Sequence, residues 1–199
     1  MTRTDGWAAR RGRTLSVVVI LLGAAIVLIG STQTWLTATV ESTDIPAKGS
    51  QALALLQPLA LAGLALTLAL ALVGKVLRFV FAGLAVVIGV ALAVLIAPIA
   101  YEQPVSAVAR VVTDHTGVAG VASVSGLVSG ISATAWPIIS LVAAIVLAFG
   151  GLLALVTAAF WRRGTSRYDA PKTSSHAGDG PLDAVESWDE LTRGDDPTN

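Results

Sequence analysis

The 199-residue sequence has no cysteine and only two histidines. The lack of cysteine excludes disulfides, thiolate metal sites and cysteine nucleophiles. His115 falls in a loop and His176 in the C-terminal tail, so we expect two solvated side chains and not a shared metal site. The sequence contains neither a glycine-rich phosphate loop nor a zinc signature. It therefore predicts no catalytic residue, no metal, no cofactor and no nucleic-acid partner, and we expect a protein that is not an enzyme.

Charged residues are also scarce, at 13% of the chain against about 25% in a usual soluble domain. Hydrophobic residues make up 54%, and the mean hydropathy is +0.76. A water-soluble fold would have too little polar side chain to cover such a surface. The composition therefore predicts that the solvent for most of the chain is a lipid bilayer.

Four apolar stretches contain no Asp, Glu, Lys, Arg or His. Each comes close to the roughly 20 residues that a helix needs to cross about 30 Å of hydrocarbon. Every backbone amide in lipid needs an internal partner, and no alternating strand pattern is present, so we expect helices. We predict an all-α polytopic membrane protein, with four transmembrane helices in a compact antiparallel bundle held by small residues such as Gly89. The transmembrane domain is expected over 15–161, with spans at about 15–35, 52–73, 79–100 and 135–161.

The basic residues predict the orientation of the spans. Only Lys48 and Arg110 fall on one side; the other side carries Arg3, Arg10, Arg11, Arg13, Lys75, Arg78, Arg162, Arg163, Arg167, Lys172 and Arg193. The positive-inside rule then places both termini in the cytoplasm, and we expect a bacterial plasma (inner) membrane. The basic N-terminus, 1–14, and a largely disordered tail with an acidic, tryptophan-containing end, 162–199, are the expected cytoplasmic parts. The alternative is that the first span is a cleaved signal peptide, although Thr37 to Thr39 make a poor cleavage site.

Aromatic and polar residues add finer expectations about the spans. Trp35, Trp136 and Trp161 stand near span ends, where indole rings act as anchors at the membrane interface. Gln57 and Pro58 predict a kink in the second span, because proline frees a backbone carbonyl that the glutamine amide can satisfy. The alternative interpretation is that this pair contacts a substrate.

Two segments between spans are expected on the outer side. In the first, "WLTATV" has strand character and "STDIPAKGS" is prone to turns. In the second, Pro104 is expected to open a helix that places Val105, Val108 and Val112 on one face. The following "GVAGVASVSGLVSGISA" is open to several interpretations: a second short helix, a loop on the headgroups, a ligand-binding lid or a partner contact.

The tail ends in "SWDELTRGDDPTN", which resembles the end of the tryptophan-region conserved, or tryptophan-associated, transmembrane protein family of actinobacteria. The matching residues are Trp188, Asp189, Leu191, Arg193, Gly194, Asp196, Pro197 and Thr198. "STQTWLTATV", "RYDAP" and "AWP" also look like stretches of that family. The resemblance implies a link to tryptophan biosynthesis genes but supplies no functional residues.

The resemblance also implies that the tail string is a recognition element. Trp188 and Leu191 are three residues apart, so one helical turn would place both on one face as an anchor pair. The predicted partner-docking residues are Trp188, Asp189, Leu191, Arg193, Asp196 and Pro197. The plainer alternative is a short polar tail with incidental aromatic residues.

Two functional hypotheses follow. The first is a non-enzymatic accessory or scaffold protein, linked to tryptophan metabolism, that presents its tail to a cytosolic or membrane protein partner. The second is a small permease or exporter subunit for tryptophan or a related indole compound. A path between subunits of a homo-oligomer would serve the second, because the spans lack partners for an ammonium or carboxylate group.

Overall fold

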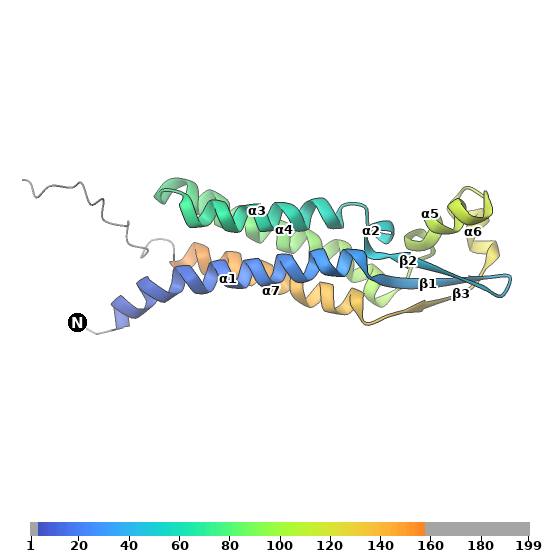
Figure 1. Cartoon of the computed structure of the whole chain (residues 1–199), viewed down its shortest axis with the longest axis horizontal. Coiled ribbons are helices and arrows are strands. Elements are labelled where there is room, and N and C mark those ends of the chain that lie inside the picture. The colour runs from blue at the N-terminus through green and yellow to red at the C-terminus, as the bar shows by residue number, and fades with distance from the viewer. Residues whose placement is uncertain (1–3, 158–199) are drawn as a thin grey trace, which may run out of the picture. The chain divides into compact units, whose positions relative to one another are not determined.

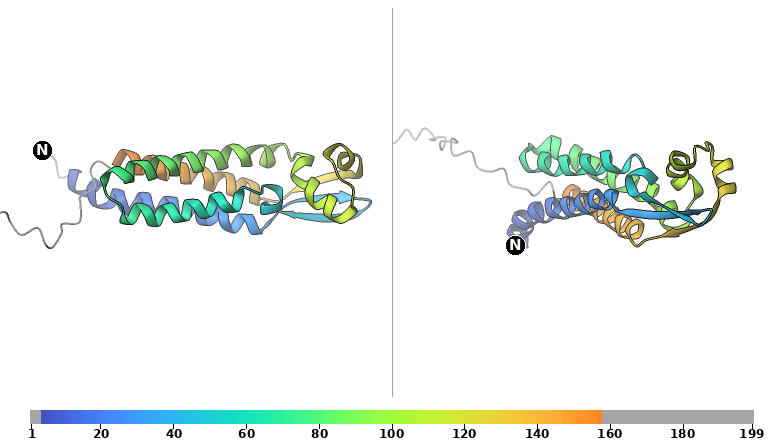
Figure 2. Two further views of the ribbon diagram at one scale, coloured as in Figure 1. Left: turned by 90° about the horizontal axis from the view of Figure 1, so that it is seen from above. Right: turned by 45° about the vertical axis from the view of Figure 1, so that its right-hand side comes forward.

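The computed structural model describes residues 4–157, and within them the side chains of all residues except 4–13 and Lys75. Four helices of the described part run lengthwise beside one another (Figures 1 and 2). They are α1 (Thr4–Thr32), α3 (Leu56–Leu72), α4 (Lys75–Tyr101) and α7 (Trp136–Thr157). Three segments are long and apolar enough to cross a membrane, namely Thr14–Thr32, Val76–Tyr101 and Trp136–Thr157, while α3 has 17 residues.

The four helices pack in a ring. α7 packs most extensively on α4 and α1, and α3 packs on α1 and, less extensively, on α4. Leucine, isoleucine and valine side chains cover the outside of the ring, which is the surface that lipid would contact. Alanines such as Ala24, Ala85 and Ala144 are completely buried inside it. Small residues inside and large ones outside are what helix association in lipid requires, because close backbone approach replaces the hydrophobic effect there.

Glycines mark the closest approaches between helices. A methyl group on Gly89 of α4 would lie 2.5 Å from the backbone nitrogen of Ala148 in α7. A methyl group on Gly151 would lie 2.8 Å from the backbone nitrogen of Val86, and one on Gly23 would lie 2.8 Å from the carbonyl oxygen of Ala143. α7 therefore contacts α4 and α1 almost backbone to backbone. Among the small residues of α4, Ala85 and Gly89 are buried and Ala93 is half-buried.

One end of the bundle carries a second structured region, which we call the head (residues 33–55 and 102–135). It contains β1 (Thr34–Val40), β2 (Thr43–Lys48) and β3 (Val128–Ala133), which form an antiparallel sheet in the order β2-β1-β3. Three short helices complete it: α2 (Gly49–Ala52), α5 (Val105–Thr116) and α6 (Val121–Leu127). The all-α prediction was therefore wrong in this respect: the fold is mostly helical, with a small sheet at one end of the bundle (Figure 1).

Two strands of the sheet connect directly to helices of the bundle. β1 begins two residues after α1 ends, and β3 ends three residues before α7 begins. β1 and β2 form a hairpin whose two loop residues, Glu41 and Ser42, both have positive φ angles of 47° and 70°. Two successive left-handed residues match the twist of the flanking strands, although neither residue is the glycine or asparagine usually found there. The expected strand character of "WLTATV" is confirmed, while most of the segment predicted as a turn is β2.

The second predicted outer segment folds more fully than a surface loop. α5 begins immediately after Pro104, as predicted, and it buries Val108 and Val112 while Val105 is half-buried. Gly117 ends the helix in the left-handed conformation, with φ 73°. The small-residue stretch that follows is the short helix α6 and then β3, which pairs with β1. The interpretation as a loop on the headgroups was wrong, because the stretch lies in a sheet with long-range backbone pairing.

Candidate functional site

Trp35 lies where the bundle meets the head, and it is completely buried. Its indole Nε1 donates a 2.8 Å hydrogen bond to the carbonyl oxygen of Gly30, near the end of α1. The last carbonyls of a helix have no partner within the helix, so this oxygen is available to a donor from outside. The backbone N–H of Gln33 donates to the same oxygen at 3.1 Å. Trp35 was predicted as an anchor at the membrane interface, and that prediction was wrong because the chain turns at the end of α1 and folds the ring inward.

Gly49 makes room for the Trp35 ring, and Gly30 makes room for Ser140 of α7. A methyl group on Gly49, at the start of α2, would lie 2.6 Å from both Cε2 and Nε1 of the ring. On the α7 side, the side-chain oxygen of Ser140 stands where a methyl group on Gly30 would be. Ser140 is completely buried, and its Oγ accepts or donates no hydrogen bond within the described part of the chain.

The junction formed by Gly30, Trp35, Gly49 and Ser140 closes the head end of the bundle. Trp136 is half-buried, with its ring 3.8 Å from the position that a Gly30 methyl would take. Its predicted role as an interface anchor stays a prediction. Trp161 and the docking residues Trp188, Asp189, Leu191, Arg193, Asp196 and Pro197 lie outside the described residues.

Gln57 and Pro58 do not kink a helix. α3 begins at Leu56, so Pro58 is its third residue, and both side chains are exposed. A proline in the first turn removes an N–H that would have no partner within the helix in any case. The predicted kink was therefore wrong, because the span was assumed to begin at 52, before the helix does.

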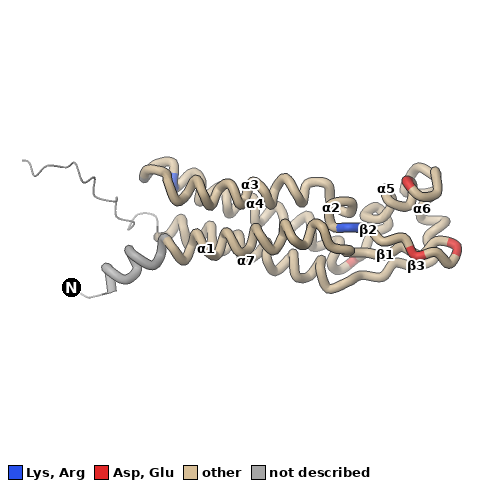
Figure 3. The backbone as a smooth tube through the Cα atoms, in the orientation of Figure 1, with Lys and Arg blue, Asp and Glu red and all other residues tan. Residues whose placement is uncertain are grey.

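At the end of the bundle opposite the head, Arg78 is buried close to the α3–α4 link (Figure 3). Its Nη2 donates to the carbonyl oxygen of Val73, which follows the last residue of α3, at 3.3 Å. A cation at the C-terminal end of a helix interacts favourably with the helix dipole. Arg78 thus bonds to the link between α3 and α4.

A cleft of mixed polarity lies in the head, with a volume of about 230 Å³. It is bounded by the β1–β2 turn and the C-terminal end of α5, and its lining residues are Val40, Glu41, Thr43, Ile45, His115 and Thr116. Glu41 and His115 are both exposed, which agrees with the solvated His115 that the sequence predicts. No group of three His, Asp or Glu residues within the described range is arranged to hold a metal ion. Sequence reasoning missed this cleft, since Glu41 and His115 are far apart along the chain and neither belongs to a recognisable motif.

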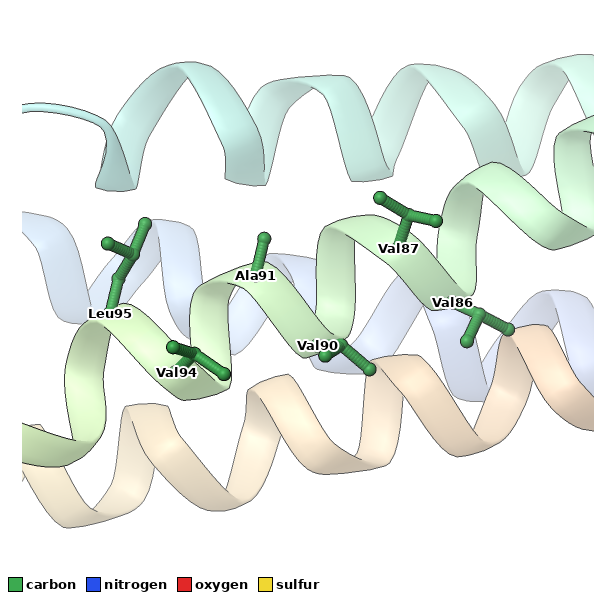
Figure 4. Close-up of a pocket in the computed structure, with 6 residues that line it drawn as sticks. All are labelled: Val86, Val87, Val90, Ala91, Val94 and Leu95. Atoms are coloured by element: carbon green, nitrogen blue, oxygen red, sulfur yellow. The ribbon is translucent and has the colours of Figure 1, made fainter.

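The larger grooves are apolar and lie on the outside of the bundle. One, of about 540 Å³, follows α4 along Val86, Val87, Val90, Ala91, Val94 and Leu95 (Figure 4). Another, of about 280 Å³, lies between α1 and α7 and is lined by Ile26, Ile138, Ile139, Val142, Ala143 and Val146. Neither groove offers a polar side chain to a hydrated solute. Both suit acyl chains.

Comparison with known proteins bears on the whole chain. A family model for tryptophan-associated transmembrane proteins matches residues 17–198. This match agrees with the resemblance noted in the sequence, and it includes both the Trp35 region and the tail string. No curated protein matched the chain, and no solved structure matched it either.

Proposed function

The chain belongs to the tryptophan-associated transmembrane protein family, and from that membership we propose a non-enzymatic accessory or scaffold protein linked to tryptophan metabolism. It is an integral membrane protein. The observation that carries the proposal is the closed bundle: helices touch through Gly23, Gly89 and Gly151, and Trp35 fills the head end. Such a bundle has little interior volume for a solute or a reaction. Its two ends are therefore the parts available for function.

The proposed topology has four spans with both termini in the cytoplasm of a bacterium, in the plasma membrane. At 1.5 Å per residue, α3 is about 25 Å long, and its flanking apolar residues extend it toward the thickness of the hydrocarbon core. Lys75 and Arg78 start α4 at the end away from the head. The positive-inside rule assigns that end to the cytoplasm and the head to the outer side.

We assign recognition of a cytosolic or membrane protein partner to the tail, with Trp188 and Leu191 as the apolar anchor pair. Asp189, Arg193 and Asp196 supply charges beside it, and Pro197 stands beyond the turn. The family match extends over this string, which supports a role shared within the family. Aromatic and leucine anchors at helical spacing are a common mode of peptide docking.

The test is recovery of partners with tagged full-length protein extracted in a mild detergent. Trp188→Ala combined with Leu191→Ala is expected to lose a partner that the wild type retains. The matched control changes the opposite side of the same turn, Glu190→Ala, and is expected to retain it. Identical sets of recovered proteins from wild type and the anchor variant would contradict the docking role.

A further inference from the structure

The two edges of the head sheet differ in whether their backbone groups are free. Antiparallel strands alternate between residues that bond to the neighbouring strand and residues whose N–H and C=O point away from it. The backbone N–H of Thr134 donates to the carbonyl oxygen of Trp35 at 2.9 Å, so every second residue of β3, counted back from Thr134, bonds to β1. Ser132 and Gly130 then bond toward β1, whereas Ile131 and Ala133 direct their N–H and C=O groups outward.

The opposite edge, on β2, is closed. The alternation there turns Asp44, Pro46 and Lys48 outward. Pro46 has no N–H to donate, and the N–H of Lys48 already donates to Oε1 of Gln51 at 2.9 Å. α5 also packs against β2, and Asp44 and Lys48 add charge to that edge. Proline, charge and a covering helix are the usual devices by which natural proteins prevent strand addition at an edge.

β3 has none of these devices. Its sequence, VSGISA, contains neither proline nor charge, and its chief packing partners are β1 and α6. Four of its six residues are exposed, and a methyl group on Gly130 would meet no atom within 4 Å. In Figure 1 and in the right-hand view of Figure 2, β3 forms the border of the sheet, and no described element lies along its outer side. An uncovered, uncharged edge of this kind is a template for another strand.

We propose that the outer edge of β3 accepts an extended segment of a different protein as a fourth strand of the head sheet. Backbone bonds to Ile131 and Ala133 would hold this segment, and alternate side chains would lie on the covered face of the sheet. The proposal concerns the head and not the tail, so it is tested independently of the proposed docking function.

A second copy of the chain does not fit this edge. The strands continue in the direction of the helices (Figure 1), so two copies inserted in the same sense present parallel β3 strands. In a parallel pair, a residue that bonds across the pair lies opposite a residue that points away, and it bonds to the two neighbours of that residue. The bonding residues of the two strands are therefore offset by one position along the chain. A two-fold axis along the membrane normal permits no such offset. A symmetric β3–β3 pair is thereby excluded, and the occupant we propose is an extended segment of a different protein.

The probe for this edge is a fluorescein-labelled peptide that copies β1, TWLTATV, titrated onto the full-length protein in lipid nanodiscs. The wild type is expected to bind it. Ala133→Pro removes an outward N–H that the sheet does not use, so the fold is retained and binding weakens by about tenfold or more. Ser132→Ala changes an exposed side chain and no backbone group, and it is expected to bind within about twofold of the wild type.

Two methylated peptides make the test independent of whether Ala133→Pro folds. One carries N-methyl groups on Leu36 and Ala38 of the copied sequence, and the other carries them on Thr37 and Thr39. Only one set of alternate amides faces β3, so one methylated peptide is expected to bind and the other to lose binding. Lack of binding to the wild type, or equal effects of the two methylation patterns, would overturn the proposal. Disulfide-linked dimers of an Ala133→Cys variant in membranes would also overturn it, by placing a second copy at the edge.

Discussion

A buried indole hydrogen bond links the end of α1 to the head. The Nε1–H of Trp35 is buried away from water, so without the Gly30 carbonyl it would lose its partner entirely. Burying an unsatisfied donor costs about 1–3 kcal/mol, which is more than a satisfied bond contributes. The pairing of Trp35 with Gly30 therefore fixes the angle at which β1 leaves α1.

Replacement of Trp35 by Phe removes this donor and part of the ring volume. We expect Trp35→Phe to lower the free energy of unfolding by about 1–3 kcal/mol, from the lost bond and the space left behind. The measurement is unfolding in increasing SDS in mixed micelles. Trp136→Phe is the matched control, and because that ring is only half-buried the expected loss is smaller. A larger loss for Trp136→Phe would contradict the central position assigned to Trp35.

A position at the end of an apolar span predicts a tryptophan at the membrane interface, but it does not reveal whether the ring turns inward and is buried. Trp35 follows an apolar run by a few residues, as an interface anchor would. Its ring lies in the cavity left by Gly49, and its indole bonds to the Gly30 carbonyl. No local pattern announces such a cavity, so the residue was found from sequence while its environment was not.

Two glycines of α4 differ in how closely other atoms approach them. Gly89 faces α7 at contact distance from the Ala148 backbone, whereas a methyl group on Gly83 would find no atom within 4 Å. Backbone atoms do not move aside as the end of a flexible side chain does. The first glycine is therefore required by packing and the second is not.

The two glycines give a matched pair of variants. We expect Gly89→Ala to destabilise the bundle by about 1–3 kcal/mol, because the added methyl forces α4 and α7 apart. Gly83→Ala is expected to be neutral or to stabilise by up to about 1 kcal/mol through helix propensity. Both are measured by the same SDS titration. Equal effects of the two substitutions would show that α4 does not approach α7 as closely as described.

The helices were predictable as elements, and most of the sheet was not. Long runs without charge identify helices in lipid, because no other backbone structure satisfies its own amides there. β1 was recognisable from its β-branched residues, but β3 reads VSGISA, which has few of them and no steady alternation. Its strand state comes from pairing with β1 across a long stretch of chain, and that pairing leaves no local signal.

The whole molecule, as we propose it, exposes its head on one side of the membrane and its tail on the other. The natural absence of cysteine allows a direct test with single introduced thiols. Ser42→Cys, at the exposed hairpin turn, is expected to react with an impermeant maleimide in intact cells. Glu190→Cys is expected to react only after the membrane is opened. Labelling of position 190 in intact cells would overturn the four-span topology.

The closed bundle also leads us to expect no transport. Proteoliposomes containing the protein should take up radiolabelled tryptophan no faster than protein-free vesicles, because the described spans offer an ammonium or carboxylate group no polar route. Opening the head end by Trp35→Ala is the informative comparison. Saturable uptake by the wild type, together with altered uptake by this variant, would favour the permease interpretation instead.

The pairing of β1 with β3 has a consequence for biosynthesis. Ninety residues separate Thr39 from Ser129, whose side chain bonds to the Thr39 carbonyl. At translation rates of about 5–20 residues per second, the hairpin waits roughly 5–18 seconds for its third strand. α3 and α4 are made during that interval, so the nascent chain carries an open β1 border until the last helix is about to emerge. The sheet can be completed only after α3 and α4 have been synthesised, so the order of synthesis acts as a checkpoint on assembly.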